Sequence, residues 1–143
     1  MMLLLLPAAV QAQWHCQTKG NANTVIRYTG SDREVQIPDK INRLPVNSIG
    51  KGAFYACTNL TQVVIPASVT NIENRAFWYC PKLTRVIFIG NAPIINQYVF
   101  DGDSKAIIIY SEGTTGWGKT FGGRPTEGWS AKPFLQPPLS TSR

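Results

Sequence analysis

The chain has 143 residues, of which 43% are apolar, and this is enough for one domain that buries a core. The formal net charge is +6, but the 14 Lys and Arg residues are scattered and form no stripe. A basic chain is weakly attracted to acidic surfaces such as envelopes or glycans. Specific nucleic-acid binding is not expected, because no recognised motif accompanies the charge.

The N-terminal residues are typical of a secretory signal. An apolar stretch opens at Leu3 and ends in Val10-Gln11-Ala12, which places small residues where a signal peptidase reads them. This pattern predicts a signal peptide over residues 1–12 and cleavage before Gln13, although no Lys or Arg precedes the leucines. The alternative is a disordered apolar N-terminus. The stretch is too short for a transmembrane helix, which needs about 20 residues, so we expect an exported chain with no transmembrane segment.

A 23-residue repeat runs through the middle of the chain. The stretch 48–66 aligns with 71–90 in a constant register, which pairs Ile49 with Ile72, Phe54 with Phe77, Cys57 with Cys80, Leu60 with Leu83, and Val63 with Val86. Adding the same offset again gives a degenerate third copy that pairs Phe77 with Phe100 and Val86 with Ile109. A half-copy, Val35–Pro38, precedes the first and is followed by an insertion around Arg43-Leu44-Pro45.

The period lies in the range of about 20–29 residues that leucine-rich repeats use. Leu60-x-x-Val63-x-Ile65 reproduces their L-x-x-L-x-L core, in which alternate residues face inward from a strand. Ala53, Cys57 and Leu60 fall at helical spacing, so each repeat predicts one short strand and one helical or irregular segment. We therefore expect an α/β repeat solenoid whose stacked coils form a parallel β-sheet.

The cysteines and acidic residues predict no metal or cofactor site. An odd number of cysteines argues against a disulfide framework, and Cys57 and Cys80 occupy one position in adjacent coils. We expect them to be buried free thiols, although the spacing of adjacent coils leaves a disulfide open. Zinc is not expected with His15 as the one histidine, and Asp101 with Asp103 are too few carboxylates for calcium.

The repeats resemble a known family. Ile-Gly-x-x-Ala-Phe-x-x-Cys-x-x-Leu-x-x-Val-x-Ile-Pro, from Ile49 to Pro66, is similar to the BspA-like leucine-rich-repeat family, and the segment from Asn71 to Phe88 repeats it. The resemblance covers roughly residues 24–129, where Gly113–Gly118 and Phe121–Pro125 look like the tail that closes such domains. It implies a bacterial-type extracellular or cell-surface protein that serves adhesion and protein binding rather than catalysis.

One segment matches a nucleotide-binding motif by letters alone. Gly113–Thr120 reads G-x-x-x-x-G-K-T, the P-loop pattern, after the apolar stretch Ile107–Tyr110. A P-loop needs a helix after its lysine, and Phe121-Gly122-Gly123-Arg124-Pro125 cannot sustain one. We interpret the segment as a capping loop in which Trp117 and Phe121 cover the last coil. A P-loop enzyme remains the alternative; no catalytic residue is otherwise predicted.

The predicted domain order follows from these boundaries. We expect a lead-in over 13–23 and the repeat domain over 24–129, with repeats at about 35–62, 63–85 and 86–110 and a cap at 111–129. The Pro- and Ser-rich residues 130–143 are typical of a disordered tail.

The outward positions of the strands form the candidate binding face. The 23-residue register predicts one outward column of Glu34, Gln62, Arg85 and Ile108, and a second of Gln36, Val64, Ile87 and Tyr110. Contiguous exposed apolar groups often mark interaction sites, and we place the candidate ligand-binding face at Gln62, Val64, Arg85, Ile87, Ile108 and Tyr110. The partner class is a protein or a surface glycan. The alternatives are a capping tail over this face or a structural spacer with no ligand.

Overall fold

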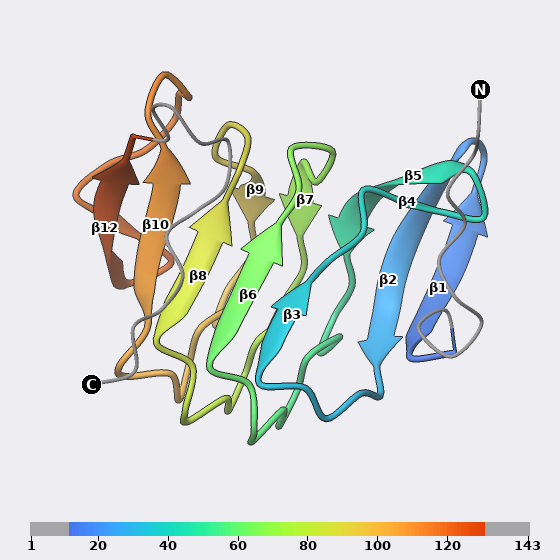
Figure 1. Cartoon of the computed structure of the whole chain (residues 1–143), viewed down its shortest axis with the longest axis horizontal. Coiled ribbons are helices and arrows are strands. Elements are labelled where there is room, and N and C mark those ends of the chain that lie inside the picture. The colour runs from blue at the N-terminus through green and yellow to red at the C-terminus, as the bar shows by residue number, and fades with distance from the viewer. Residues whose placement is uncertain (1–11, 131–143) are drawn as a thin grey trace.

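Each turn of the chain crosses two β-sheets that face one another, as the computed structural model of residues 12–130 shows (Figure 1). The strands are β1 (Trp14–Lys19), β2 (Ala22–Tyr28), β3 (Glu34–Gln36), β4 (Lys40–Ile41), β5 (Leu44–Ile49), β6 (Gln62–Ile65), β7 (Asn71–Ile72), β8 (Arg85–Phe88), β9 (Ile94–Ile95), β10 (Ile107–Ser111), β11 (Thr120–Phe121) and β12 (Arg124–Trp129). Sheet A has the order β1-β2-β5-β7-β9, with β4 paired to β5, and sheet B has the order β11-β12-β10-β8-β6-β3. None of the described elements is a helix.

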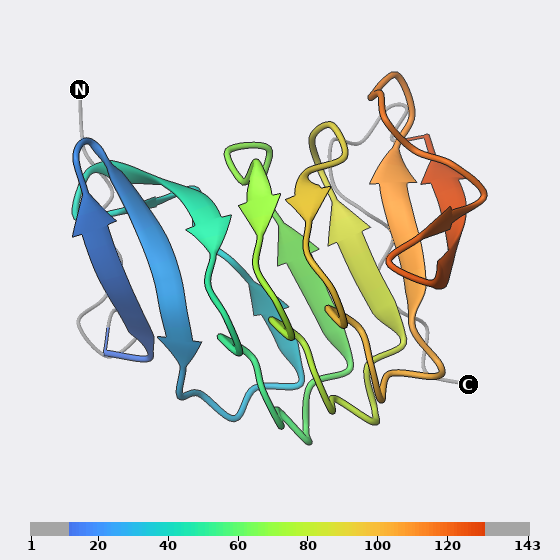
Figure 2. The same ribbon diagram turned by 180° about the vertical axis from the view of Figure 1, so that it is seen from behind.

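Parallel pairing between successive coils confirms the repeat. In sheet B, Val35 pairs with Val63 and Val63 with Val86, as the half-copy and the 23-residue offset predict. In sheet A, Ile49 pairs with Ile72 and Ile72 with Ile95. The view from behind shows the short strands of sheet A, β5, β7 and β9, running in the opposite direction to those of sheet B (Figure 2). The chain is therefore a solenoid in which each coil contributes one strand to sheet A and one to sheet B.

Of the predicted helical or irregular segment, the helical alternative is wrong, and a third side built from tight turns is found instead. These turn segments, residues 50–61, 73–84 and 96–106, lie at the lower edge of the molecule (Figure 2). Along the first two segments, N–H groups alternate between two kinds of acceptor: the Tyr55 N–H bonds to the Gly52 oxygen three residues back, whereas the Phe54 N–H bonds across to the Ala76 oxygen in the next coil. The backbone thus pairs between coils rather than within a helix.

Left-handed backbone at two repeated positions is what excludes the helix. Gly52, Arg75 and Tyr98, which occupy one position in successive coils, have φ of 64°, 58° and 60°. Ala56, Tyr79 and Gly102 form a second column with φ of 56°, 61° and 85°. A right-handed helix requires negative φ at every residue, so neither position is compatible with it. The apolar spacing that suggested a helix is met instead by inward-pointing residues of the turns.

The register of the last repeat also differs from the prediction by one residue. Val86 pairs with Ile108 rather than Ile109, and Arg85 pairs with Ile107. The cause is a loop shortened by one residue: two residues separate Leu83 from Val86, whereas one separates Ala106 from Ile108. A one-residue slip moves every side chain of a strand to the other face. Ile108 accordingly points into the core and is fully buried.

A ladder of aromatic rings forms the spine of the core. Phe54 and Phe77 are fully buried, as the repeat predicted, and their rings stack with centroids 4.8 Å apart and planes at 12°. Phe100 continues the stack at 5.7 Å from Phe77. Tyr28 and Trp14 extend it toward the N-terminus, with Tyr28 5.3 Å from Phe54 and Trp14 4.7 Å from Tyr28. One aromatic side chain from each coil therefore joins the coils end to end.

Hairpins close both ends of the stack. At the N-terminal end β1 pairs antiparallel with β2, and the predicted boundary at residue 24 falls inside β2. At the C-terminal end, Trp117 and Phe121 pack on Phe88 with ring centroids at 5.0 Å and 5.5 Å. The insertion around Arg43 forms the β4–β5 hairpin, with Asn42 and Arg43 in the left-handed region.

Two predicted segments lie mostly or wholly beyond the described part of the chain. The signal peptide over residues 1–12 and the tail over 130–143 overlap it only at residues 12 and 130. Within residues 12–130, no helix has the length and apolar character that crossing a membrane requires.

Candidate functional site

The outer face of sheet B carries the predicted binding columns, with the last repeat shifted. The strand pairings align Glu34, Gln62, Arg85 and Ile107 in one outward column, and Gln36, Val64, Ile87 and Ile109 in the other. Ile108 and Tyr110, predicted to close these columns, do not belong to them. Tyr110 pairs with Phe88 and its ring stacks on that of Trp117 at 5.2 Å, so it belongs to the aromatic cluster at the C-terminal end.

Burial divides the remaining predicted residues. Val64 and Arg85 are half-exposed. Gln62 is 7% exposed, and its Oε1 has no hydrogen-bond partner within the described chain. Ile87 is fully buried although it lies outside the core cluster, so the prediction of an open apolar surface at Ile87 is wrong. The accessible part of the face is consequently centred on β3 and β6 rather than on β8.

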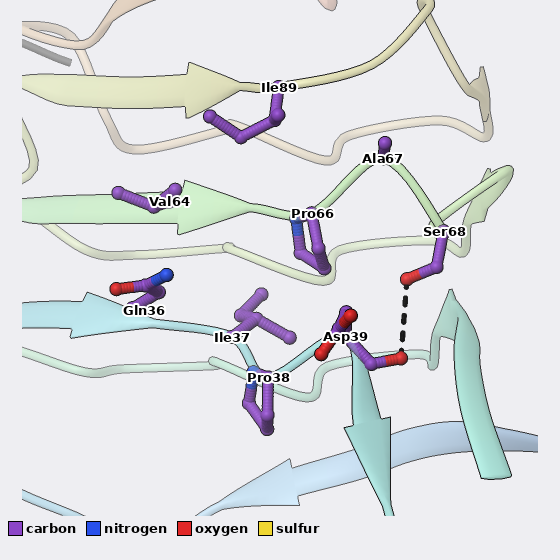
Figure 3. Close-up of a pocket in the computed structure, with 9 residues that line it drawn as sticks. All are labelled: Gln36, Ile37, Pro38, Asp39, Val64, Pro66, Ala67, Ser68 and Ile89. Atoms are coloured by element: carbon purple, nitrogen blue, oxygen red, sulfur yellow. Dashed lines mark hydrogen bonds between the residues drawn. The ribbon is translucent and has the colours of Figure 1, made fainter. Parts of the chain in front are cut away.

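A groove of about 730 Å³ lies on this accessible part. Figure 3 shows the side chains that line it, which come from the ends of β3 and β6 and from the segments that follow β3, β6 and β8: Gln36, Ile37, Pro38, Asp39, Val64, Pro66, Ala67, Ser68 and Ile89. The walls are mainly aliphatic, and polar groups come from the Gln36 amide, the Asp39 carboxylate and the Ser68 hydroxyl. This combination of apolar walls with a few polar groups is typical of sites that receive a ligand.

The groove is shaped by the way the strands end. Pro38 and Pro66 follow β3 and β6, and because proline has no N–H the strand pairing stops there. The chain then bends toward sheet A, and the Ser68 hydroxyl donates to the Asp39 backbone oxygen at 3.5 Å across the coils. The next coil approaches closely at Gly90, where an added Cβ would lie 2.7 Å from the Cα of Ala67. Glycine is therefore required at this edge.

The letter match to a P-loop has no P-loop geometry. Thr120 begins the two-residue strand β11 rather than a helix. Within the loop, the Thr115 N–H donates to the Asn91 side chain at 2.9 Å and the Thr114 N–H to Ser111, so neither is available to a phosphate. A shallow hollow of about 590 Å³ is lined by Tyr110, Trp117, Gly118, Lys119 and Thr126. Trp117 of this segment instead packs against Phe88 and Tyr110, and the role of the segment as a cap stays a prediction.

A buried carboxyl group lies at the end of the turn column. Asp103 takes the position of the repeated cysteine, is 1% exposed, and accepts a hydrogen bond from the Cys80 N–H at 2.6 Å through Oδ1. Its Oδ2 has no hydrogen-bond partner among residues 12–130. Burial raises the pKa of Asp103 to about 7, against the lowering effects of the Cys80 N–H and the Arg124 charge. This carboxyl group therefore changes between its protonated and ionised forms near neutral pH.

The three thiols are free, and burial raises the pKa of each. Cys80 is fully buried and its Sγ donates to the Phe54 oxygen at 3.2 Å, whereas Cys57 is half-exposed. A raised pKa means little thiolate, which is the nucleophilic and metal-binding form. Burial likewise raises the pKa of Tyr28 to about 12, with Asp32 adding to the effect. Within residues 12–130, no group of three or more His, Cys, Asp or Glu side chains is placed to hold a metal ion.

The sequence reasoning missed the exposed side chains of the turn segments. Large side chains that reach solvent there are Tyr55, Trp78, Tyr79 and Tyr98. Their positions within the repeat carried a signal, because Tyr55 and Trp78 occupy the same position of adjacent coils and neither falls on an inward position. Helical spacing directed attention to the apolar residues of these segments, and the aromatic residues between them were not weighed.

Two stacked sheets of short parallel strands, joined by tight turns that recur in each coil, define a leucine-rich-repeat solenoid. The family described as "BspA type Leucine rich repeat region (6 copies)" matches residues 27–120. The chain belongs to this family.

Solved structures show the same architecture. The T. pallidum Leucine Rich Repeat protein is similar with a TM-score of 0.59 and 22% identity, over 87% of this chain and 64% of that one. A leucine rich cell surface protein from Faecalibacterium prausnitzii A2-165 has a TM-score of 0.54 and 28% identity, over 68% of this chain and 32% of that one. This chain thus spans less than two thirds of the length of either protein. No curated protein matches it.

Proposed function

We propose that this chain is an exported, cell-surface protein-binding module, without catalytic activity, whose groove on sheet B receives an extended segment of a partner protein. The observation that carries the proposal is the groove of about 730 Å³, which opens on the accessible part of sheet B at β3 and β6. Its aliphatic walls suit apolar side chains, and the Gln36 and Ser68 groups suit a peptide backbone.

Family membership, the description of a similar protein and the N-terminal sequence support this function. The F. prausnitzii protein with the same fold is a cell surface protein by its description, and the apolar segment over residues 1–12 is typical of an export signal. Repeat solenoids commonly bind through their extended surfaces rather than through catalytic clefts. A protein partner is favoured over a glycan here because, among residues 12–130, the groove lining contains no aromatic ring on which a sugar could stack.

The test uses a photo-crosslinking amino acid placed in the mature chain that begins at Gln13. Position 67 lines the groove and is exposed, whereas position 94 on β9 of sheet A is 73% exposed and distant from the groove. We expect a discrete protein adduct from position 67 on material from the native surroundings, and none from position 94.

The matched variants are Val64→Glu in the groove and Ile94→Glu outside it. Val64→Glu should abolish the adduct because it places a charge on the groove wall, while Ile94→Glu should leave it unchanged. Circular dichroism confirms that both variants fold. A structural spacer predicts no adduct at either position, and adducts at both positions with equal yield would contradict a site in the groove.

A further inference from the structure

Aromatic side chains gather on the turn segments, away from the groove. Among the exposed large side chains are Tyr55, Trp78, Tyr79 and Tyr98, with exposed fractions of 50%, 36%, 54% and 53%. They belong to three successive coils, and the turn segments that carry them hydrogen-bond to one another through the backbone. Exposed aromatic groups in one region of a surface are a recognised mark of an interaction site.

Two of these side chains, Trp78 and Tyr98, lie next to one arginine, and a third, Tyr55, stacks on Trp78. The rings of Tyr55 and Trp78 stack with centroids 5.2 Å apart and planes at 25°. The guanidinium carbon of Arg75 lies 4.9 Å from the centroid of Trp78 and 5.6 Å from that of Tyr98. The guanidinium therefore lies over two aromatic rings, and its N–H groups make no hydrogen bond to another residue of 12–130. Such an arginine is held in place with its donors available.

The backbone conformation at three positions of this surface is strained for the residues that occupy them. Arg75, Tyr79 and Tyr98 have φ of 58°, 61° and 60°, in the left-handed region where glycine is the least strained residue. Equivalent positions of neighbouring coils hold Gly52 and Gly102. The three large side chains are exposed and absent from the core cluster, so core packing does not offset this strain. Strained residues of this kind cluster at functional sites.

The chemistry of the surface favours a carboxylate-bearing partner. An arginine fork pairs two N–H groups with one carboxylate, and the edges of aromatic rings are electropositive. The turn segments also carry Lys51, Lys82 and Lys105 against the accessible carboxylates of Glu73 and Asp101, so the cations are in excess. A sugar that stacks requires an open ring face, whereas Tyr55 and Arg75 already contact the face of Trp78.

We propose that the turn side is a second binding surface, in which Arg75 held between Trp78 and Tyr98 recognises an acidic peptide segment of a partner protein. Side-chain carboxylates of the peptide pair with the guanidinium edge, and the exposed rings of Tyr55 and Tyr79 contact its apolar groups. This surface is separate from the groove on sheet B, so the proposal does not depend on the function proposed for that groove.

The experiment measures binding of fluorescently labelled poly-L-glutamate by anisotropy, with a heparin fragment as the alternative anionic probe. The variants are Arg75→Gly and Tyr98→Gly, and the matched control is Arg43→Gly. Arg43 is also exposed and also left-handed, with φ of 68°, but it lies in the β4–β5 hairpin. Glycine suits all three backbones, so each variant should melt at or above the parent temperature.

We expect Arg75→Gly to weaken poly-L-glutamate binding by about tenfold or more, as for residues that dominate an interface, and Tyr98→Gly to weaken it measurably. Arg43→Gly should change it by less than about twofold, in the manner of a remote charge. Equal losses for Arg75→Gly and Arg43→Gly would overturn the proposal, because they would show attraction to net charge alone. Tighter binding of heparin than of poly-L-glutamate, with the same dependence on Arg75, would also overturn it in favour of an anionic glycan.

Discussion

Replacing Phe77 by Ala tests whether the aromatic ladder holds the coils together. Phe77 is fully buried and stacks on both neighbours, Phe54 at 4.8 Å and Phe100 at 5.7 Å. A phenylalanine buries on the order of 200 Å², which at about 25 cal/mol per Å² corresponds to about 4–5 kcal/mol, part of which the alanine retains. The residual cavity adds to the loss, so we expect a decrease in the free energy of unfolding of about 3–5 kcal/mol.

That decrease is a large share of the stability of a small domain, which is typically about 5–15 kcal/mol. Stability of a solenoid is roughly a sum over repeats and their interfaces, and Phe77 lies at two of those interfaces. Urea unfolding followed by circular dichroism gives the difference, and we expect much of the Phe77→Ala chain to be unfolded without denaturant. Trp78→Ala, at the next residue, removes an exposed ring and should cost far less. A loss below about 1 kcal/mol for Phe77→Ala would refute the interpretation of the ladder as the core.

Two further predictions concern single groups. The pKa of Asp103 is raised to about 7, so the folded chain holds this proton more tightly than the unfolded chain and loses stability as pH rises from about 4 to about 7. Asp103→Asn should remove the accompanying decline in melting temperature. Asp101→Asn, at an exposed position, should retain that decline. Gly90→Ala should lower the melting temperature because its Cβ would meet the backbone of the preceding coil at 2.7 Å, while Gly118→Ala, where the nearest atom is 3.5 Å away, should not; equal melting temperatures would contradict the close approach of the coils.

The fold followed from the sequence wherever the repeat is regular. Val63 and Val86 pair as the 23-residue offset requires, because the alternation of residues along a strand leaves one register in which the inward apolar side chains are buried. The third copy lacks one residue before β10, and an alignment by constant offset carried Ile108 to the wrong face. The apolar residues gave a warning: Ile107, Ile108 and Ile109 follow one another, so alternation alone does not choose between the two faces.

Tight turns are found where a helix was predicted, because the spacing of apolar residues does not determine whether the backbone is right-handed or left-handed. Ala53 and Leu60 point inward from a helix or from a series of tight turns alike, and both are buried. What decides between them is left-handed backbone at two positions per coil. Glycine signals such a position, yet the middle coil has Arg75 and Tyr79 there. A sequence therefore conceals left-handed backbone where another residue takes the place of the glycine.

The candidate site was only partly predictable, since the alternation of residues along a strand indicates which face a side chain points to but not how exposed that side chain is. Ile87 points outward and is nonetheless fully buried, while Val64 on the adjacent strand remains half-exposed in the groove. Exposure depends on what packs over each outward side chain, and the repeat pattern does not contain that information. A solenoid of three sides also offers more than one free surface. The groove next to Val64 and the arginine-centred surface at Arg75 arise from different parts of the same repeat, so substitutions in one should leave binding at the other unchanged.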